Sequence, residues 1–288
     1  MIRSMTGFAR REAEIGNGRL QWELRAVNHR YLETSLRLPE ELRSLEPAAR
    51  EALRERLGRG KVEGYLRWQP SHETSGRLAL DAGLLGEIRT ALAAVAKAIP
   101  NTAPANPMEI LRWPGVVSAP AVDTTRLREP VLNLLEQTLD ELVQQRLQEG
   151  ERLAQTLTSR SAELADWVAA IRARRPAVQA ALRDKLLNRV AEVSANPNED
   201  RLEQELALLA QKMDVAEELD RLDSHITALR AALTQTEPVG RRLDFLMQEL
   251  NREANTLSAK AADAETTAAT VEMKVLIEQM REQVQNIE

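Results

Sequence analysis

The sequence predicts an α+β protein in which a compact N-terminal α+β domain is followed by a C-terminal domain of long, coiled-coil-like helices. Three observations indicate this class. Apolar and polar residues alternate on either side of one helical stretch in the first 70 residues, prolines cluster before residue 121, and turn signals become rare beyond Asp123. We therefore expect two domains, at residues 1–122 and 123–288. Aromatic residues make up only 3% of the chain, so the core must be built of Leu, Ala and Val, which suits helices better than sheets.

Strands dominate the predicted N-terminal domain. Residues Arg19–Val27 alternate between apolar and polar side chains, as those of a half-buried strand do. The glycine-rich turn at residues 16–18 indicates a hairpin with Ser4–Ile15. Leu and Ala at helical spacing then predict a helix between Pro39 and Gly58, and alternation returns in a third strand at Lys61–Gln69.

A second helix and a connector complete this domain. The Ala-rich stretch Leu84–Ile99 predicts a helix that Pro100 ends. Prolines in the following 20 residues forbid a continuous helix and indicate a connector with short turns: Pro104, Pro107, Pro114 and Pro120. We expect the domain boundary in this connector.

Long helices are expected in the C-terminal domain, separated by turn signals around Pro130, Pro176 and residues 195–198 and 238–240. One helix carries a heptad seam, in which apolar residues recur at alternating steps of four and three: Val215, Leu219, Leu222, Ile226, Leu229 and Leu233. Leu164–Val193 is the expected antiparallel partner, because residues 196–198 (Asn-Pro-Asn) could turn the chain back on itself.

Composition excludes several classes of protein. The absence of cysteine rules out a disulfide framework, a thiolate zinc site and a cysteine nucleophile, and the cytosol is the expected compartment. Neither a signal-peptide-like nor a membrane-spanning apolar run is found, so no membrane association is expected. A phosphate-binding glycine loop, a Gly-x-Ser-x-Gly elbow and a His-Glu-x-x-His zinc helix are also missing. With a net charge of −5, any contact with nucleic acid must be local.

One face of the seam helix carries side chains that could perform chemistry. Asp214, Glu218, Arg221 and His225 share this face because they are spaced by four, three and four residues, and Glu217 lies one turn before Arg221. Carboxylates and an imidazole on one face could bind a divalent metal or transfer protons. Ion pairs one turn apart, such as Glu217 with Arg221, explain the same pattern, and spacing alone favours that interpretation.

A second polar face lies on the last helix predicted, which starts after Pro238. The residues in register along it are Arg242, Glu249, Glu253 and Lys260. Asn251 and Asn255 flank this face one turn apart. Amides in the middle of a helix are mildly unfavourable, so one interpretation is a role in binding or between subunits. A solvated face with two tolerated amides fits the pattern equally well.

A basic cluster follows the second predicted strand, at Asn28, His29, Arg30 and Tyr31. An imidazole, guanidiniums and an aromatic ring together can hold a phosphate and stack a base. A strand end at which His29 satisfies a backbone carbonyl is the simpler interpretation. Other basic residues in this half of the chain are Arg25, Arg37, Arg59 and Lys61.

Together these motifs resemble the YicC-like endoribonuclease family of bacteria. In the N-terminal half the resemblance rests on residues 4–8 (Ser-Met-Thr-Gly-Phe), 27–33 (Val-Asn-His-Arg-Tyr-Leu-Glu) and 59–62 (Arg-Gly-Lys-Val). In the C-terminal half it rests on residues 214–222 (Asp-Val-Ala-Glu-Glu-Leu-Asp-Arg-Leu), 224–225 (Ser-His), 240–249 (Gly-Arg-Arg-Leu-Asp-Phe-Leu-Met-Gln-Glu) and 251–257 (Asn-Arg-Glu-Ala-Asn-Thr-Leu). The match covers nearly the whole chain, and residues 71–128 are its least diagnostic part.

The resemblance implies an RNA-cleaving cytoplasmic protein that acts as a homo-oligomer, with a hexamer as the expected form, and whose activity a divalent metal supports. Because the family motifs fall on the two C-terminal polar faces, we expect function there. The expected cofactor is Mn²⁺ or Mg²⁺, and the expected metal ligands are Glu217, Glu218, His225, Glu249 and Glu253. The expected catalytic residues are Glu218, Arg221, His225, Glu249 and Glu253, with Arg221 countering phosphate charge.

RNA capture needs positive charge that an acidic monomer lacks overall, so we expect oligomerisation to line a cavity or groove with basic residues. The expected RNA-binding residues are Arg25, Asn28, His29, Arg30, Arg37, Arg59 and Lys61. Two alternatives stay open. A non-catalytic adaptor that presents RNA to another nuclease would need the basic groove alone, and a structural protein acting through partner helices would need only the heptad seam.

Overall fold

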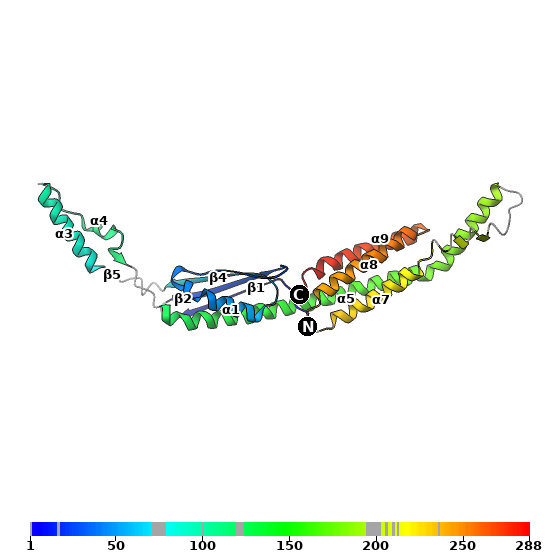
Figure 1. Ribbon diagram of the computed structural model, residues 1–288, viewed down its shortest axis with the longest axis horizontal. Helices are drawn as coiled ribbons and strands as arrows, with labels where there is room; N and C mark the ends of the chain where they lie inside the picture. The colour runs from blue at the N-terminus through cyan, green and yellow to red at the C-terminus, as the bar shows by residue number, and fades with distance from the viewer. Residues whose placement is uncertain are drawn as a thin grey trace.

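The computed structural model describes residues 2–15, 18–70, 79–99, 101–118, 124–193 and 203–288, the last range with gaps at 205–206, 209–210, 212 and 236. The molecule is elongated, and its parts follow one another along the long axis (Figure 1). A small unit of two helices stands at one end, a helix-covered sheet lies next to it, and a bundle of helices follows. One helix, α5 (Thr124–Val193), runs along the sheet and continues through the bundle.

The sheet has four strands in the order β1-β2-β4-β3, with bounds Gly7–Ile15, Gly18–Val27, Gly60–Pro70 and Leu32–Arg37 respectively. β2 pairs antiparallel with β1 and β4, whereas β3 pairs parallel with β4. Alternate β2 residues are buried, as the sequence pattern predicts. The hairpin and the third predicted strand are therefore confirmed. Residues 16–17, in the turn of the hairpin, lie outside the described residues. β3 is not among the predicted strands, because only Leu32 and Leu36 of its six residues are strongly apolar and only Leu36 is buried.

Helices cover one face of the sheet. They are the 3-10 helix η1 (Glu40–Leu45), α1 (Glu46–Arg56) and the N-terminal half of α5, and they share one core with the strands. The Trp22 indole donates a hydrogen bond of 3.0 Å to the backbone oxygen of Val131 in α5. The helix predicted between Pro39 and Gly58 is confirmed, except that it starts as a 3-10 turn. α5 contributes to the cores of both halves of the molecule, and the predicted division after residue 122 stays a prediction.

The small unit consists of α3 (Ala82–Ala98), α4 (Pro107–Arg112) and a two-stranded ribbon of β5 (Ala79–Leu80) and β6 (Val117–Ser118). The predicted helix at Leu84–Ile99 is confirmed as α3. The predicted connector also contains α4, because Pro107 occupies the first turn of that helix, where a missing N–H costs no hydrogen bond.

α5 is a helix of 70 residues that contains Pro130 and Pro176. The expectation that these prolines mark turns is wrong. A proline inside a helix removes one backbone hydrogen bond and costs about 3 kcal/mol. Val131 is anchored in the core of the sheet and Ile171 in the core of the bundle, so the packing of α5 outweighs that local cost.

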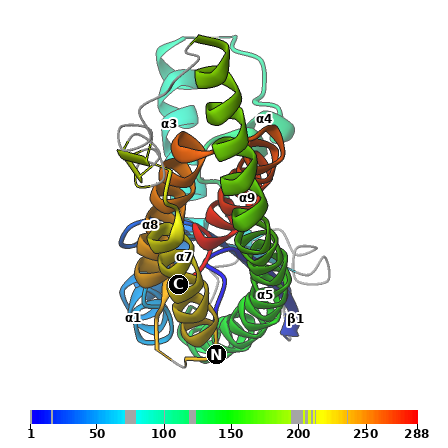
Figure 2. The ribbon, with the colours of Figure 1, turned by 90° about the vertical axis from the view of Figure 1, so that its right-hand side faces the viewer.

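The bundle contains α7 (Ala216–Leu233), α8 (Gly240–Lys260), α9 (Ala264–Val284) and the second half of α5. Viewed along the long axis, these helices lie around a common interior (Figure 2). The predicted seam of α7 is confirmed, because five of its six residues are buried and Leu233 is half-buried. Within the described residues, no helix is both long and apolar enough to cross a membrane.

α7 runs antiparallel to α5, as predicted. Arg172 of α5 pairs with Asp220 at 2.9 Å, and Arg175, further along α5, pairs with Asp214, earlier in α7, at 2.7 Å. The turn expected at residues 196–198 lies outside the described residues. The last predicted helix is confirmed as α8, but α9 follows it as a separate helix. Asp263 starts α9 by accepting hydrogen bonds from the backbone N–H groups that follow it.

Both ends of the described chain meet between the sheet and the bundle (Figure 1). Ser4 forms an isolated β-bridge with Ile287, and its backbone N–H donates to the carbonyl oxygen of Arg146 in α5 at 2.9 Å. The chain passes so close to α5 that a Cβ atom at Gly150 would lie 2.1 Å from the backbone oxygen of Ile2. Only glycine allows this approach, which joins the two halves of the molecule.

Candidate functional site

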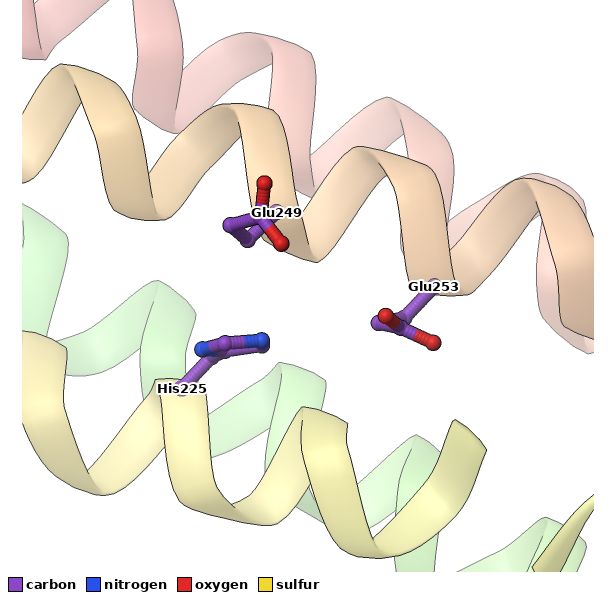
Figure 3. A group of neighbouring side chains, drawn as sticks. All are labelled: His225, Glu249 and Glu253. Carbon is purple, nitrogen blue, oxygen red and sulfur yellow. The ribbon is translucent and has the colours of Figure 1, made fainter. Parts of the chain in front are cut away.

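Three side chains that can bind metal meet between α7 and α8 (Figure 3). His225 comes from α7, and Glu249 and Glu253 come from successive turns of α8. One ligand atom from each residue lies within 4.8 Å of the ligand atoms of the other two. Glu253 is only 3% exposed, whereas His225 and Glu249 are half-buried. The group is therefore partly enclosed and still reachable from solvent.

The apolar stripes of the two helices place these side chains. On α7, Ile226 is buried in the bundle, so His225 beside it stands at the edge of the interface. On α8, Leu250 and Ala254 are buried, so the residue before each of them, Glu249 and Glu253, projects from one edge of that helix. α7 and α8 pack against each other, and these two edges face one another (Figure 3).

The donor set fits a divalent cation. Two carboxylates that each offer an oxygen within 4.8 Å of the other and of an imidazole nitrogen can share one cation. An imidazole nitrogen and two carboxylate oxygens suit a divalent transition metal such as Mn²⁺. Ligands about 2.1 Å from a common ion lie at most about 4.2 Å apart, so a small adjustment of the side chains would bring these atoms to coordinating positions.

Two arginines contact this group: Arg252 pairs with Glu249 at 4.0 Å, and Arg221 contacts Glu253. The Nη1 atom of Arg221 lies 3.4 Å from Oε1 of Glu253, and its other terminal nitrogen pairs with Glu217. The charge of Glu217, followed by the hydrogen bond to Glu253, raises the pKa of Arg221 above its ordinary value. The guanidinium therefore stays charged while half of its side chain remains exposed to solvent.

Glu217 and Glu218, which were also expected to bind metal, lie outside the three-residue group. Glu217 is exposed and forms the ion pair with Arg221 that the sequence pattern allowed. Glu218 is 7% exposed, and its Oε1 accepts a hydrogen bond of 2.7 Å from Nζ of Lys260. Its Oε2 atom is buried without a hydrogen-bond partner in the described part of the chain.

Lys260 fixes the end of α8 to the start of α7. Besides Glu218, its Nζ atom donates to the backbone oxygen of Asp214 at 2.9 Å, and the carboxylate of Asp214 pairs with Arg175 of α5. These contacts join the two helices in addition to the apolar core that they share.

The other residues of the predicted α8 face lie apart from the group. Arg242 is exposed, with Nη1 3.5 Å from the side-chain oxygen of Gln235. Asn255 donates a hydrogen bond of 3.3 Å to Asn251, so the two amides satisfy each other in part at the surface.

Several expected RNA-binding residues gather where β2 ends and β4 begins. Asn28 donates a hydrogen bond of 2.6 Å to the backbone oxygen of Gln285, Nδ1 of His29 lies 3.1 Å from the backbone oxygen of Tyr31, and Arg59 donates to the backbone oxygen of His29 at 3.0 Å. The contact between His29 and a carbonyl matches the simpler of the two interpretations of this residue.

The remaining expected RNA-binding residues have few partners. The guanidinium of Arg30 lies over the ring of Tyr31 at 5.3 Å, and Lys61 pairs with Glu63 at 3.4 Å. Arg25 and Arg37 lie on the face of the sheet that the described helices leave uncovered.

The sequence pattern did not identify Arg146, whose burial depends on contacts with residues more than 100 positions away.

The fold and the site define a class of protein: an elongated α+β molecule that has a candidate divalent-cation site on its helical half and exposed cationic side chains on its sheet. A divalent cation can activate water and neutralise phosphate, and basic and aromatic side chains can hold nucleic acid. Comparison with known proteins narrows this class to one family.

The family model described as "Endoribonuclease YicC-like, N-terminal region" matches residues 2–155, and the one described as "Endoribonuclease YicC-like, C-terminal" matches residues 171–288. A probable endoribonuclease YicC from Haemophilus influenzae is 43% identical over 288 residues, and one from Clostridioides difficile is 31% identical over 293 residues. In both comparisons the alignment covers 100% of each chain. The chain belongs to the YicC-like endoribonuclease family, which confirms the resemblance seen in the sequence motifs.

Proposed function

We propose that this protein is a cytoplasmic endoribonuclease that cleaves RNA with Mn²⁺ or Mg²⁺ held by His225, Glu249 and Glu253. The observation that supports this site is the meeting of an imidazole and two carboxylates, one of them buried, from two different helices. RNA as substrate is supported by membership of an endoribonuclease family and by the names of two relatives that align along their full length.

The side chains have distinct roles in this proposal. Glu249 and Glu253 hold the metal through carboxylate oxygens, and His225 either adds a nitrogen ligand or carries a proton to the leaving oxygen. When bound, the metal supplies an activated water and neutralises charge on the scissile phosphate. Arg221 orients Glu253 and offers its remaining N–H groups to a phosphate oxygen. Glu218 acts as a positioning residue through its ion pair with Lys260.

A cleavage assay tests the proposal. A labelled single-stranded RNA is incubated with the purified protein in Mn²⁺, in Mg²⁺ or in excess chelator. We expect cleavage with at least one of the two metals and none in chelator, because the metal would supply the activated water and the charge neutralisation at the phosphate. Tight RNA binding without cleavage under every condition would establish the adaptor alternative instead. Weak binding and no cleavage would favour a structural protein.

We also propose that the protein is a homo-oligomer, with a hexamer as the expected form, and that α3 contributes to the assembly. Apolar residues recur on α3 at steps of three and four and continue to its C-cap: Leu85, Ile88, Leu92, Val95 and Ile99. This spacing is typical of a helix that packs against another helix. Nevertheless α3 has no buried residue, and Val95 and Ile99 are 48% and 58% exposed.

A second copy of the chain is the partner that best fits this seam. α4 is only six residues long and cannot cover it. The apolar stripes of α7, α8 and α9 are buried within their own bundle, so among the described helices α3 is the one with a seam and no partner. An identical seam on another copy would bury these side chains, and each one buried contributes about 1.5–3 kcal/mol.

Replacing Leu92 by Asp is expected to shift the protein to a smaller assembly, because the charge would have to be buried in the seam. Light scattering behind size-exclusion chromatography measures the mass. Ala94→Asp adds the same charge to α3 away from the seam and should leave the mass unchanged. Equal masses for both variants and the wild type would exclude α3 from the interface.

A further inference from the structure

The sheet has one face that the described helices leave uncovered. α1, η1 and α5 all pack on the other face (Figure 1). Ala9, Leu24, Leu66 and Leu36, one from each strand, are buried on that covered side. Because side chains alternate along a strand, the residue next to each of them in the sequence points to the opposite side. We call this side the open face.

Two aromatic rings stand on the open face, and each has an arginine of the neighbouring strand beside it. Phe8 of β1 is paired in register with Arg25 of β2, and Tyr65 of β4 is paired with Arg37 of β3. Phe8 is 47% exposed and Tyr65 is half-buried. The guanidinium of Arg37 lies over the ring of Tyr65, 5.5 Å from its centroid. Each ring therefore has a cation beside it.

The rings are separated in a way that leaves both accessible. β2 lies between β1 and β4, and Phe8, Arg25 and Glu63 form one row across the sheet. Tyr65 lies two residues beyond Glu63 on β4. Strand spacing and rise per residue place Phe8 and Tyr65 about 12 Å apart, too far for the two rings to cover each other. Neither ring therefore covers the other, and the exposed part of each can contact a ligand.

Two of the carboxylates near these rings form ion pairs with neighbours. Glu63 pairs with Lys61 at 3.4 Å, and Glu12 pairs with Arg10 and Arg19. Glu23 lies opposite Arg10 in the β1–β2 register and opposite Tyr65 in the β2–β4 register.

The two arginines beside the rings differ from these residues in their lack of ion pairs within the described ranges. Arg25 is exposed and has no carboxylate within ion-pair distance in the described part of the chain, and Arg37 contacts the ring of Tyr65 and no carboxylate there. Two arginines without an ion-pair partner among the described residues therefore lie next to the aromatic rings.

This combination fits one chemical class of ligand. An exposed ring offers a flat apolar surface on which any nucleobase can stack, and a guanidinium beside it can stack on a base or pair with a phosphate. Bases inside a duplex are already stacked on each other, so only unpaired bases can use such a surface. An apolar protein partner would gain little from the charged side chains between the rings.

We propose that the open face is a stacking platform for the unpaired bases of single-stranded RNA, with Phe8 and Tyr65 as the stacking rings and Arg25 and Arg37 as phosphate or base partners. The identity of the nucleic acid as RNA rests on the proposed function. The platform lies on the N-terminal sheet, apart from the metal group on α7 and α8. It would hold a strand of the substrate while the helical half cleaves the RNA.

Binding without cleavage tests this proposal separately from the nuclease activity. A fluorescein-labelled oligouridylate is titrated with the protein in excess chelator, and anisotropy gives the Kd. Phe8→Leu and Tyr65→Leu remove one ring each, Tyr65→Phe keeps the ring, and Phe245→Leu removes a ring from α8 that is 57% exposed. Loss of one stacked base is expected to weaken binding about five- to hundredfold. Tyr65→Phe and Phe245→Leu are expected to bind as the wild type does.

An oligonucleotide with abasic sites distinguishes stacking from other effects. It keeps the phosphates and lacks the bases, so the wild type should bind it as weakly as the Phe8→Leu/Tyr65→Leu double variant does. A double variant that weakens binding of the normal and the abasic strand by the same factor would overturn the proposal. An unchanged Kd in the double variant would also overturn the proposal. If the oligomeric mass changed as well, the open face would be a protein interface. In the wild type, photo-crosslinking to a 4-thiouridine strand should label peptides that contain Phe8 or Tyr65, and labelling confined to other peptides would also refute it.

Discussion

Replacing Glu253 by Gln is expected to lower the rate of metal-dependent RNA cleavage by at least about hundredfold, because an amide is a poor substitute for a charged ligand. Glu253 is the most buried member of the candidate metal group of His225, Glu249 and Glu253, and it receives a hydrogen bond from Arg221. The change keeps the shape of the side chain and removes its charge. Single-turnover rates on a labelled RNA, measured over a range of Mn²⁺ concentrations, report both the rate and the metal requirement.

Two comparisons make this prediction specific. Glu272→Gln removes an exposed carboxylate of α9 and should leave the rate unchanged. Comparison with Glu218→Gln distinguishes the loss of a metal ligand from the loss of a positioning residue, because Glu218 contacts Lys260 and lies outside the metal group. We expect Glu253→Gln to raise the Mn²⁺ concentration needed for half-maximal rate, and Glu218→Gln to leave it unchanged. A folded Glu253→Gln protein with the wild-type rate would refute the assignment of the metal site.

The periodicity of α7 and α8 predicted much of the site. Helical spacing places Glu218, Arg221 and His225 on one face of α7, and Glu249 and Glu253 on one face of α8. Spacing within one helix cannot show which residues face each other across two helices. That depends on how α7 and α8 pack against each other through the apolar core that they share.

The sheet shows the same limit. Alternation predicted β2 and β4, and the turn before β2 predicted β1. The open face depends on strand register, which pairs Phe8 with Arg25 and Tyr65 with Arg37. β3 pairs with β4 in parallel through a connection that includes α1, so the sequence has no hairpin turn that would indicate this pairing. Pro130 and Pro176 misled the prediction of α5 because local propensity cannot report the packing that compensates for a proline.

Replacing Arg146 by Ala is expected to lower the free energy of unfolding by about 3–5 kcal/mol, the usual cost of removing one partner from a buried ion pair. Arg146 is 2% exposed, and it donates to the backbone oxygen of Ser4 at 2.5 Å and to Glu288 at 3.0 Å. Burial lowers the pKa of Arg146, and the charge of Glu288 opposes that shift, so the pair depends on close contact. Urea unfolding followed by circular dichroism measures the loss.

The large effect follows from what Arg146 joins. It ties the middle of α5 to both ends of the described chain, and Ala would leave the carboxylate of Glu288 and the oxygen of Ser4 without their partner. Arg152→Ala, at a side chain that is 78% exposed, should change stability by less than about 0.5 kcal/mol. A double change, Arg146→Met with Glu288→Gln, removes both charges and should recover part of the loss. If Arg146→Ala cost less than about 1 kcal/mol, the junction would owe its stability to the apolar contacts and the glycine at position 150, and not to this ion pair.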